Sequence, residues 1–342
     1  MTSIPLVRQV VIAPAIEYLD ALGVPVNAYL RRSRLTRPRE NALEMLIPLH
    51  QVSRFLSDVA RSEGIDDLGF RIGGQLGVES LGLYGRLTAQ AFTLHELIET
   101  SLAMVRSFNS GLRIWIERHQ DQVRYCQQYV EVLPHDRITE IVHLGIANAL
   151  GSARYGEGAL WRPNRIEIAS DPVDLSTHFS GMADLPIEFN QPFTSIWVDR
   201  KVLSKPLPAL ELAQNDVGDG QAKSLLLESA PASSLLGQLE QAVESALAHP
   251  GMCLPHMAAI VGIPVRTLQR NLAQRFTSFS RVVQTVRFRM AQRLLKDTEL
   301  PVSEIAIQLG YSNPENFTRA FRRWTGVSAS DFRDIHFNDI EK

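Results

Sequence analysis

Side chains that can hydrogen-bond to base edges recur on two short helical segments near the C-terminus. Arginine can donate two hydrogen bonds to guanine, and glutamine or asparagine can pair in the same way with adenine. The first segment carries Arg266, Gln269 and Arg270 opposite its apolar positions. The second carries a longer set, which is Glu315, Asn316, Thr318, Arg319, Arg322 and Arg323. This is the chemistry that contact with bases and phosphates in a DNA major groove requires.

Each segment needs a partner helix to hold it, and the sequence contains two copies of such a pair. Residues 257–262 align with residues 305–310, and both copies have an alanine four residues before a glycine. The alanine lets a second helix cross closely, and the glycine opens a turn of about three residues. The apolar stripes that follow are Leu268, Leu272 and Phe276 in the first copy and Phe317, Ala320, Phe321 and Trp324 in the second. The spacing predicts two helix-turn-helix units, at about 254–276 and 302–324.

The sequence also indicates where the second of the two base-contacting helices begins. Ser312 and Glu315 match the capping-box pattern, in which a serine or threonine is followed three residues later by glutamate. Such a cap fixes the start of the helix, whose N-terminus would point toward phosphates or base edges.

The charge of the chain is unevenly distributed. Thirty-five basic and 37 acidic residues give a net charge of −2, which alone argues against a nucleic-acid partner. Residues 1–253 hold 22 basic and 29 acidic residues, whereas residues 254–334 hold 12 and 6 and the last eight hold one and two. A basic end on an acidic body suggests a polyanion-binding module. Any two packed helices can imitate one helix-turn-helix, but two copies in the only net-positive segment favour double-stranded DNA as the partner.

The length of 342 residues suggests two domains. Residues 1–210 predict an α+β domain with a small, mainly antiparallel sheet. The expected helices are 15–22, 26–32, 48–61, 94–108 and 137–150, and the expected strands are 113–117, 122–129, 165–169, 186–189 and 195–198, the first two forming a hairpin. Residues 211–234 have the composition of a linker, and residues 235–342 predict an all-α domain.

Six glycines lie between residues 69 and 85. A phosphate-binding loop would need a GxGxxG after a strand or a Walker lysine, and neither is present. The glycines therefore indicate tight turns and close helix packing.

The C-terminal segment resembles a known family of regulators. Residues 302–328, followed by Asp331, Phe332 and Arg333, resemble the signature of AraC/XylS-type transcriptional regulators. Residues 266–270 are similar to the first recognition helix of that family, and residues 287–295 to its long connecting helix. The N-terminal part resembles the arabinose-binding-type effector domain of the ornithine-utilisation-regulator-like subgroup, through residues 21–23, 68–73, 81–85 and 203–208.

The resemblance implies a seven-helix DNA-binding domain that places two recognition helices in successive major-groove segments. It also implies an N-terminal domain that binds a small-molecule effector and mediates homodimerisation. The expectation is a sequence-specific transcription regulator that binds promoter DNA, answers to an unidentified effector and can contact RNA polymerase. One departure is Pro264, which stands where the family usually has a capping serine. Proline cannot accept the capping hydrogen bond, although it is tolerated in the first helical turn.

Enzymatic and membrane functions lack supporting motifs. GxSxG, HExxH and CxxC are absent, so no catalytic residue and no cofactor is expected. No ligand cluster surrounds His249 and His256, so no metal site is expected either. Two cysteines fit a reducing compartment. No apolar run reaches the ~18 residues of a spanning helix, and no signal peptide is recognised, so we expect a cytoplasmic protein without membrane contact.

Several alternatives stay open. A small-molecule-binding or enzymatic domain fused to a DNA-binding anchor would share this organisation, as would a DNA-binding architectural protein that needs no effector. The sequence does not identify the effector, its pocket, the promoter, the dimer interface or whether the output is activation or repression. The aromatic residues Trp161, Phe179, Phe189, Phe193 and Trp197 are candidates for lining an effector pocket, although such residues more often form plain core.

Overall fold

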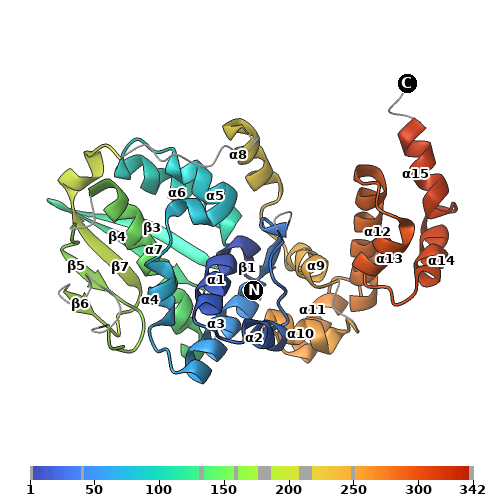
Figure 1. Cartoon of the computed structure of the whole chain (residues 1–342), viewed down its shortest axis with the longest axis horizontal. Helices are drawn as coiled ribbons and strands as arrows, with labels where there is room; N and C mark the ends of the chain where they lie inside the picture. The colour runs from blue at the N-terminus through green and yellow to red at the C-terminus, as the bar shows by residue number, and fades with distance from the viewer. Residues whose placement is uncertain are drawn as a thin grey trace. The chain divides into compact units, whose positions relative to one another are not determined.

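A computed structural model describes residues 3–39, 42–130, 135–157, 161–175, 186–207, 218–247 and 251–338 (Figure 1). The chain divides into two compact units, one of residues 5–231 and one of residues 232–342 together with residues 1–4. The first unit combines helices with a small sheet and the second is helical, so the predicted fold class is confirmed.

The first unit is built around a five-stranded sheet. Its strands run in the order β3 (Leu112–His119), β4 (Gln122–Tyr129), β7 (Thr194–Asp199), β5 (Arg165–Glu167) and β6 (Ile187–Glu188). Among the described strands, β5 and β6 alone pair in parallel, and the other neighbours in this sheet are antiparallel. The predicted hairpin is confirmed, with Leu112 opposite Tyr129 and His119 opposite Gln122. Two further strands that the periodicity does not predict, β1 (Leu6–Arg8) and β2 (Leu46–Pro48), pair with each other.

The described helices of this unit include the five that the sequence predicts and three further ones. They are α1 (Ala13–Ala21), α2 (Val26–Ser33), α3 (Leu49–Glu63), α4 (Leu68–Gly73), α5 (Gly82–Ala89), α6 (Leu94–Phe108), α7 (His135–Glu157) and α8 (Asp219–Glu228), with 3-10 turns η1 (Gln9–Ile12), η3 (Val78–Leu81) and η4 (Arg200–Ser204). The α7 helix is longer than predicted, and α4, α5 and α8 were not predicted. The α6 helix has the bounds that its periodicity predicts, and Thr93 caps it by accepting a hydrogen bond from the Glu96 amide. The α8 helix falls inside the segment of linker-like composition and packs on α5 and α6.

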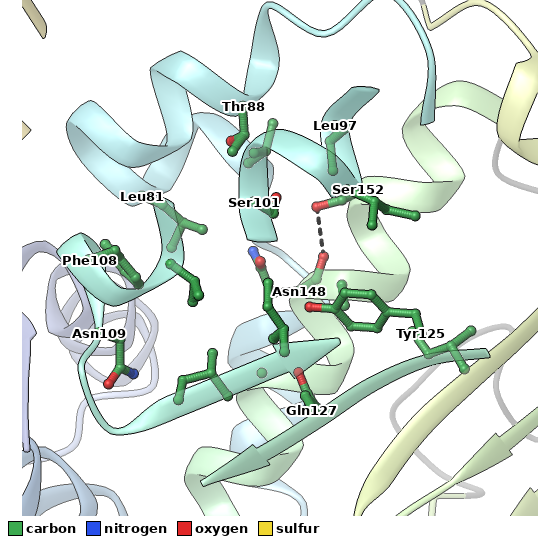
Figure 2. A pocket seen from close by; sticks show the side chains of 18 of the residues that line it. Leu81, Thr88, Leu97, Ser101, Phe108, Asn109, Tyr125, Gln127, Asn148 and Ser152 are labelled. Carbon is green, nitrogen blue, oxygen red and sulfur yellow. Dashed lines mark hydrogen bonds between the residues drawn. The ribbon is translucent and has the colours of Figure 1, made fainter. Parts of the chain in front are cut away.

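Strand alternation gives the sheet two different faces. On one face Ile114 of β3, Tyr125 of β4 and Ile196 of β7 point toward α6 and α7, as the view of the cavity in Figure 2 illustrates for Tyr125. On the other face the Arg124 guanidinium lies over the rings of Phe193 and Trp197. The apolar core of the unit therefore lies between one sheet face and the helices.

The glycine-rich segment serves close packing, as expected. A Cβ on Gly69 would lie 2.1 Å from the carbonyl oxygen of Glu140, and one on Gly73 would lie 2.6 Å from that of Leu144. Only glycine allows α4 to approach the backbone of α7 this closely.

The second unit contains seven helices in its described residues, the number that the resemblance implies. They are α9 (Leu235–Ala246), α10 (Leu254–Val261), α11 (Val265–Ala273), α12 (Phe279–Asp297), α13 (Val302–Gln308), α14 (Pro314–Thr325) and α15 (Ala329–Asn338). They form two helix pairs, α10 with α11 and α13 with α14, joined by α12 (Figure 1).

Candidate nucleic-acid interface

The first helix pair is held by small and apolar side chains. Ala258 of α10 and Leu268 and Leu272 of α11 are buried. Gly262 has φ +70°, so it ends α10 in the left-handed conformation that glycine adopts without strain. The turn then leads directly into the predicted recognition helix.

One member of the predicted stripe in this pair is wrong. Phe276 is 100% exposed, because α11 already ends at Ala273 and the chain turns at Phe276 with φ +54°. The next helix begins at once, with Ser278 accepting a hydrogen bond from the Arg281 amide at 3.3 Å. The early start of α12 removes the turn that would have brought Phe276 to the buried face.

The second helix pair has an aromatic core. Phe317 and Phe321 of α14 are fully buried, with ring centroids 5.6 Å apart, and Trp324 packs beside them, as the spacing predicts. The turn residue Gly310 has φ +71°, and a Cβ there would lie 2.1 Å from the carbonyl oxygen of Leu247. This contact joins the second turn to the residue that follows α9.

The two predicted recognition helices, α11 and α14, begin differently. Asn313, not Ser312, caps α14, since the Asn313 Oδ1 accepts a hydrogen bond of 2.7 Å from the Glu315 amide. The predicted capping box of Ser312 and Glu315 is therefore wrong: Pro314 occupies the first helical position, so the cap lies one residue later, and the residue three positions after Asn313 is Asn316 rather than a glutamate. Pro264 caps α11 without any side-chain hydrogen bond, in agreement with the departure seen in the sequence.

All nine predicted contact residues are exposed. Three lie on α11 and six on α14, namely Arg266, Gln269, Arg270, Glu315, Asn316, Thr318, Arg319, Arg322 and Arg323. Arg319 Nη2 donates a hydrogen bond of 2.6 Å to Asn316 Oδ1, which holds these two side chains together. Arg266, Arg270 and Arg322 form no salt bridge with any described residue, so their charge is available to a partner.

Other arginines of the basic segment have structural roles. Arg289 and Arg293 of α12 pair with Glu244 of α9 at 3.4 and 2.8 Å. Arg287 donates to the carbonyl oxygens of Leu309 and Gly310 at 2.9 and 3.1 Å, so it holds the turn of the second pair. Sequence reasoning placed these arginines in the connecting helix, apart from the nine, but it did not predict their contacts. The four-residue spacing of Glu240 with Glu244, repeated by Arg289 with Arg293, was the available signal.

A cavity lies in the first unit between the inner sheet face and the helices α5, α6 and α7. It offers about 120 Å³ to the centres of water-sized molecules. Figure 2 shows it with Tyr125 and Gln127 of β4, Leu97 and Ser101 of α6, and Asn148 and Ser152 of α7 around it.

The aromatic residues predicted as pocket candidates do not line this cavity. Phe193 and Trp197 lie on the opposite sheet face, against Arg124. Trp161 and Phe189 are half-buried at the edge of the core, and Phe179 lies outside the described residues. The four described candidates therefore do not line this cavity, and for Trp197 the reason is that neighbouring residues on a strand face opposite sides of the sheet.

Metal-binding side-chain clusters and membrane-spanning helices are both absent from the described residues. None of their histidine, cysteine and carboxylate side chains form a group of three or more that could hold a metal ion. His249 of the pair considered above lies outside them, and His256 Nδ1 lies 2.8 Å from the carbonyl oxygen of Gly251. Among the same residues, no helix combines the length and apolar character that crossing a membrane requires.

Comparison with known proteins identifies the family. The arabinose-binding domain of AraC transcription regulators matches residues 23–207, and a helix-turn-helix domain matches residues 257–335. Since the first match covers more than half of the chain, the protein belongs to the AraC family of transcription regulators. It is a DNA-binding regulator with an effector-binding type of N-terminal domain, as the sequence resemblance implies.

Several proteins of Pseudomonas aeruginosa are similar to this chain. The ornithine utilization regulator is 28% identical over 270 residues, which is 78% of this chain and 78% of that protein. The HTH-type transcriptional regulator VqsM is 41% identical over 69 residues, or 20% of this chain and 21% of that protein. The crystal structure of the transcriptional regulator CdpR matches 91% of this chain and 96% of its own, with 21% identity and a TM-score of 0.38.

Proposed function

We propose that the nine exposed residues of α11 and α14 are the DNA-contacting residues of this regulator. The observation that carries the proposal is the pair of exposed, partly basic helix faces, each backed by a buried apolar stripe in the same unit. Arg319 lies near the middle of α14, and Arg270 lies at the start of the last turn of the short helix α11, on the same face as Arg266 and Gln269; both side chains are proposed to reach base edges in a major groove. Arg322 and Arg323 lie in the last turn of α14 and are suited to phosphates.

The proposal assigns the remaining parts of the chain as follows. Residues 1–210 bind the effector and form the homodimer, and residues 235–342 bind DNA. The connection between them lies within residues 211–234, of which α8 packs on the first unit. Effector binding changes the arrangement of the dimer or of its domains, and hence promoter occupancy or contact with RNA polymerase. The protein works in the cytoplasm, and no catalytic step is assigned to it.

Alanine substitutions test this division of roles on a DNA site selected from a random-sequence pool. Arg270→Ala and Arg319→Ala should each weaken binding to the selected site by about 1–3 kcal/mol and weaken binding to random DNA less. Arg322→Ala and Arg323→Ala should weaken binding to both DNAs alike and lower the salt dependence, because phosphate contacts carry no sequence information.

Arg289→Ala is the matched control, since this arginine belongs to the same unit but pairs with Glu240 and Glu244. Arg289→Ala should not weaken binding to the selected DNA more than binding to random DNA, or the reverse. Equal losses on selected and random DNA for Arg270→Ala would remove the base-reading role of Arg270.

A further inference from the structure

The cavity of the first unit combines apolar walls with a complete lack of charge. Its described lining residues include no Asp, Glu, Lys, Arg or His. Most are aliphatic or aromatic, contributed by η3, α5, α6, α7 and the inner faces of β3, β4 and β7. A carboxylate or ammonium group placed here would lose its hydration and find no opposite charge, which disfavours binding of an ionised ligand.

Three tyrosines on the wall remain neutral phenols. Burial raises the pKa of Tyr84 to about 12, with a hydrogen bond from Ser101 opposing the shift. Burial also raises the pKa values of Tyr125 and Tyr129. The wall therefore offers hydroxyl groups and no phenolate to a ligand.

Two side-chain amide nitrogens of residues that line the cavity have no hydrogen-bond acceptor among the described residues. Gln127 is only 2% exposed, and its Nε2 has no hydrogen-bond acceptor. The Nδ2 of Asn148, on the facing helix α7, is buried and also lacks an acceptor. A buried donor without a partner is rare in proteins and costs free energy. Other polar groups on the wall are satisfied internally, as when Ser152 donates to the Asn148 carbonyl oxygen at 3.0 Å and Thr88 donates to that of Tyr84 at 3.0 Å.

We infer that the effector is a small, uncharged, mainly apolar molecule whose oxygen acceptor binds the free amides of Gln127 and Asn148. This inference deepens the proposed function and rests on the effector-binding role assigned to residues 1–210. The volume of about 120 Å³ is similar to that of the ~150 Å³ apolar cavity that takes up benzene in another protein. The class that fits is a monocyclic molecule carrying a ketone, ester or other neutral acceptor.

Four benzene derivatives of similar size test the inference on the full chain, by thermal unfolding and calorimetry. Acetophenone is neutral and has an acceptor, ethylbenzene lacks the acceptor, benzoate is an anion and benzylammonium is a cation. Acetophenone at saturating concentration should raise the melting temperature by about 2–4 °C. Ethylbenzene should bind more weakly, and the two ions should not bind.

Substitutions at the two amides locate the site. Gln127→Leu and Asn148→Leu should each weaken acetophenone binding about tenfold and leave ethylbenzene binding unchanged. Gln128→Leu is the matched control, because Gln128 is the next residue on β4 and does not line this cavity. If either variant fails to fold, Ala149→Leu, which narrows the cavity from α7, should abolish binding of both neutral probes.

The outcomes separate this inference from the proposed function. Binding of benzoate or benzylammonium as tight as that of acetophenone overturns the inference, as does a lack of acetophenone binding or binding that none of the cavity variants weakens. Affinity for the selected DNA site, measured on the same proteins without any probe, tests the DNA-contacting role separately. If the protein binds the selected DNA but none of the probes, the inferred ligand class is refuted and the DNA-contacting role is unaffected.

Discussion

The Nη2 of Arg8 donates a hydrogen bond of 2.8 Å to the carbonyl oxygen of Leu226 in α8. Arg8 is 0% exposed, and its other donors bind the carbonyl oxygens of Ser107 and Glu44 at 3.0 and 2.9 Å. The Glu44 carboxylate lies 3.3 Å from Arg8 and also accepts from the Leu83 amide in the first turn of α5. One buried guanidinium thus connects the helix that ends this unit with a helix on the wall of the cavity.

We predict that Arg8→Met lowers the free energy of unfolding by about 3 kcal/mol. The substitution leaves several buried carbonyl groups without a hydrogen-bond donor and the Glu44 carboxylate without its cation. Hydrogen exchange of amides in residues 219–228 should accelerate more than exchange in α3. Arg37→Met is the matched control: its ion pair with Asp20 is exposed and should contribute far less. Similar losses in chemical denaturation for the two variants would contradict a special role for Arg8.

A second prediction concerns pH and two buried groups on α7. Burial raises the pKa of Glu140 from 4.5 to about 8, with the Gly69 amide opposing and the carboxylates of Asp67 and Asp66 adding to the shift. Burial lowers the pKa of His143 from 6.5 to about 3. Its Nε2 lies 2.8 Å from the hydroxyl of Ser170, and its ring stacks on Phe70.

The signs of the two effects differ. The folded protein retains a proton on Glu140 that the unfolded chain releases above pH 4.5, so this group lowers stability as pH rises toward 8. The unfolded chain protonates His143 below pH 6.5 while the folded protein does not, so this group raises stability as pH rises from 3 to 6.5. The two contributions offset each other between pH 4.5 and 6.5.

Above pH 6.5 only the effect of Glu140 remains, and the free energy of unfolding should fall by about 1.4 kcal/mol per pH unit up to pH 8. Glu140→Gln, which keeps an acceptor for the Gly69 amide, should remove this fall. The control Glu99→Gln changes an exposed carboxylate and should leave the fall in place. Denaturation midpoints between pH 6 and 8 that do not differ between Glu140→Gln and the unchanged protein would show that Glu140 is already ionised.

A third prediction concerns the boundary of the second unit. Ser234 caps α9 by accepting a hydrogen bond of 3.1 Å from the Gly237 amide, and the Ala232 amide donates to Gln241 at 2.8 Å. A fragment of residues 232–342 should therefore fold and bind the selected DNA. A fragment of residues 235–342 should be about 1 kcal/mol less stable, because the cap is lost. Ser234→Ala in the longer fragment should reproduce most of that loss in thermal denaturation, and an unfolded longer fragment by circular dichroism would place the boundary elsewhere.

A fourth prediction concerns the length of the DNA site. The 19 residues of α12 span about 28 Å, and successive major-groove segments on one DNA face lie ~34 Å apart. One chain should therefore contact two different blocks about 10–11 base pairs apart, with modest DNA bending. Five inserted base pairs between the blocks rotate one of them by about half a turn and should abolish tight binding by the 232–342 fragment.

Ten inserted base pairs return the two blocks to the same face of the DNA but move them a full turn further apart. This insertion therefore distinguishes two rigidly connected helix-turn-helix units from two flexibly connected ones. Because Arg287 and Gly310 fix the second turn to α12 and to Leu247, we expect this insertion to fail as well. Unchanged affinity for the five-base-pair insertion would mean that the two helices do not read DNA together.

Local patterns predicted much of this molecule. The apolar period of α6 predicts both of its bounds without tertiary information, and the structure adds the Thr93 cap at its start. The β1–β2 pair was missed because three-residue strands about 40 residues apart carry no period. Phe276 satisfied the helical spacing, but the cap of the following helix ended α11 first. The spacing of apolar residues does not show where one helix ends because the next one begins.

The cavity illustrates a different obstacle. Ile196 and Val198 of β7 line it, whereas the intervening Trp197 faces away. The sequence drew attention to Trp197 for its size, whereas the inferred ligand contacts are the amide nitrogens of Gln127 and Asn148, which lack acceptors. These donors lie on different elements, and only the folded structure reveals that neither has an acceptor. The nine predicted contact residues depend on local helix faces alone, and all of them are exposed as expected.

The two predicted recognition helices of this chain differ in sequence, so under the proposed function any DNA site bound by one chain is asymmetric. A regulator with one reading helix per subunit binds a palindrome and is indifferent to its reversal. Here α11 presents Arg266, Gln269 and Arg270, while α14 presents a longer set beginning at Glu315. Turning the site end for end exchanges what lies upstream and downstream of the bound chain. The orientation of a site relative to the transcription start thus becomes a regulatory variable that selection can act on separately from affinity.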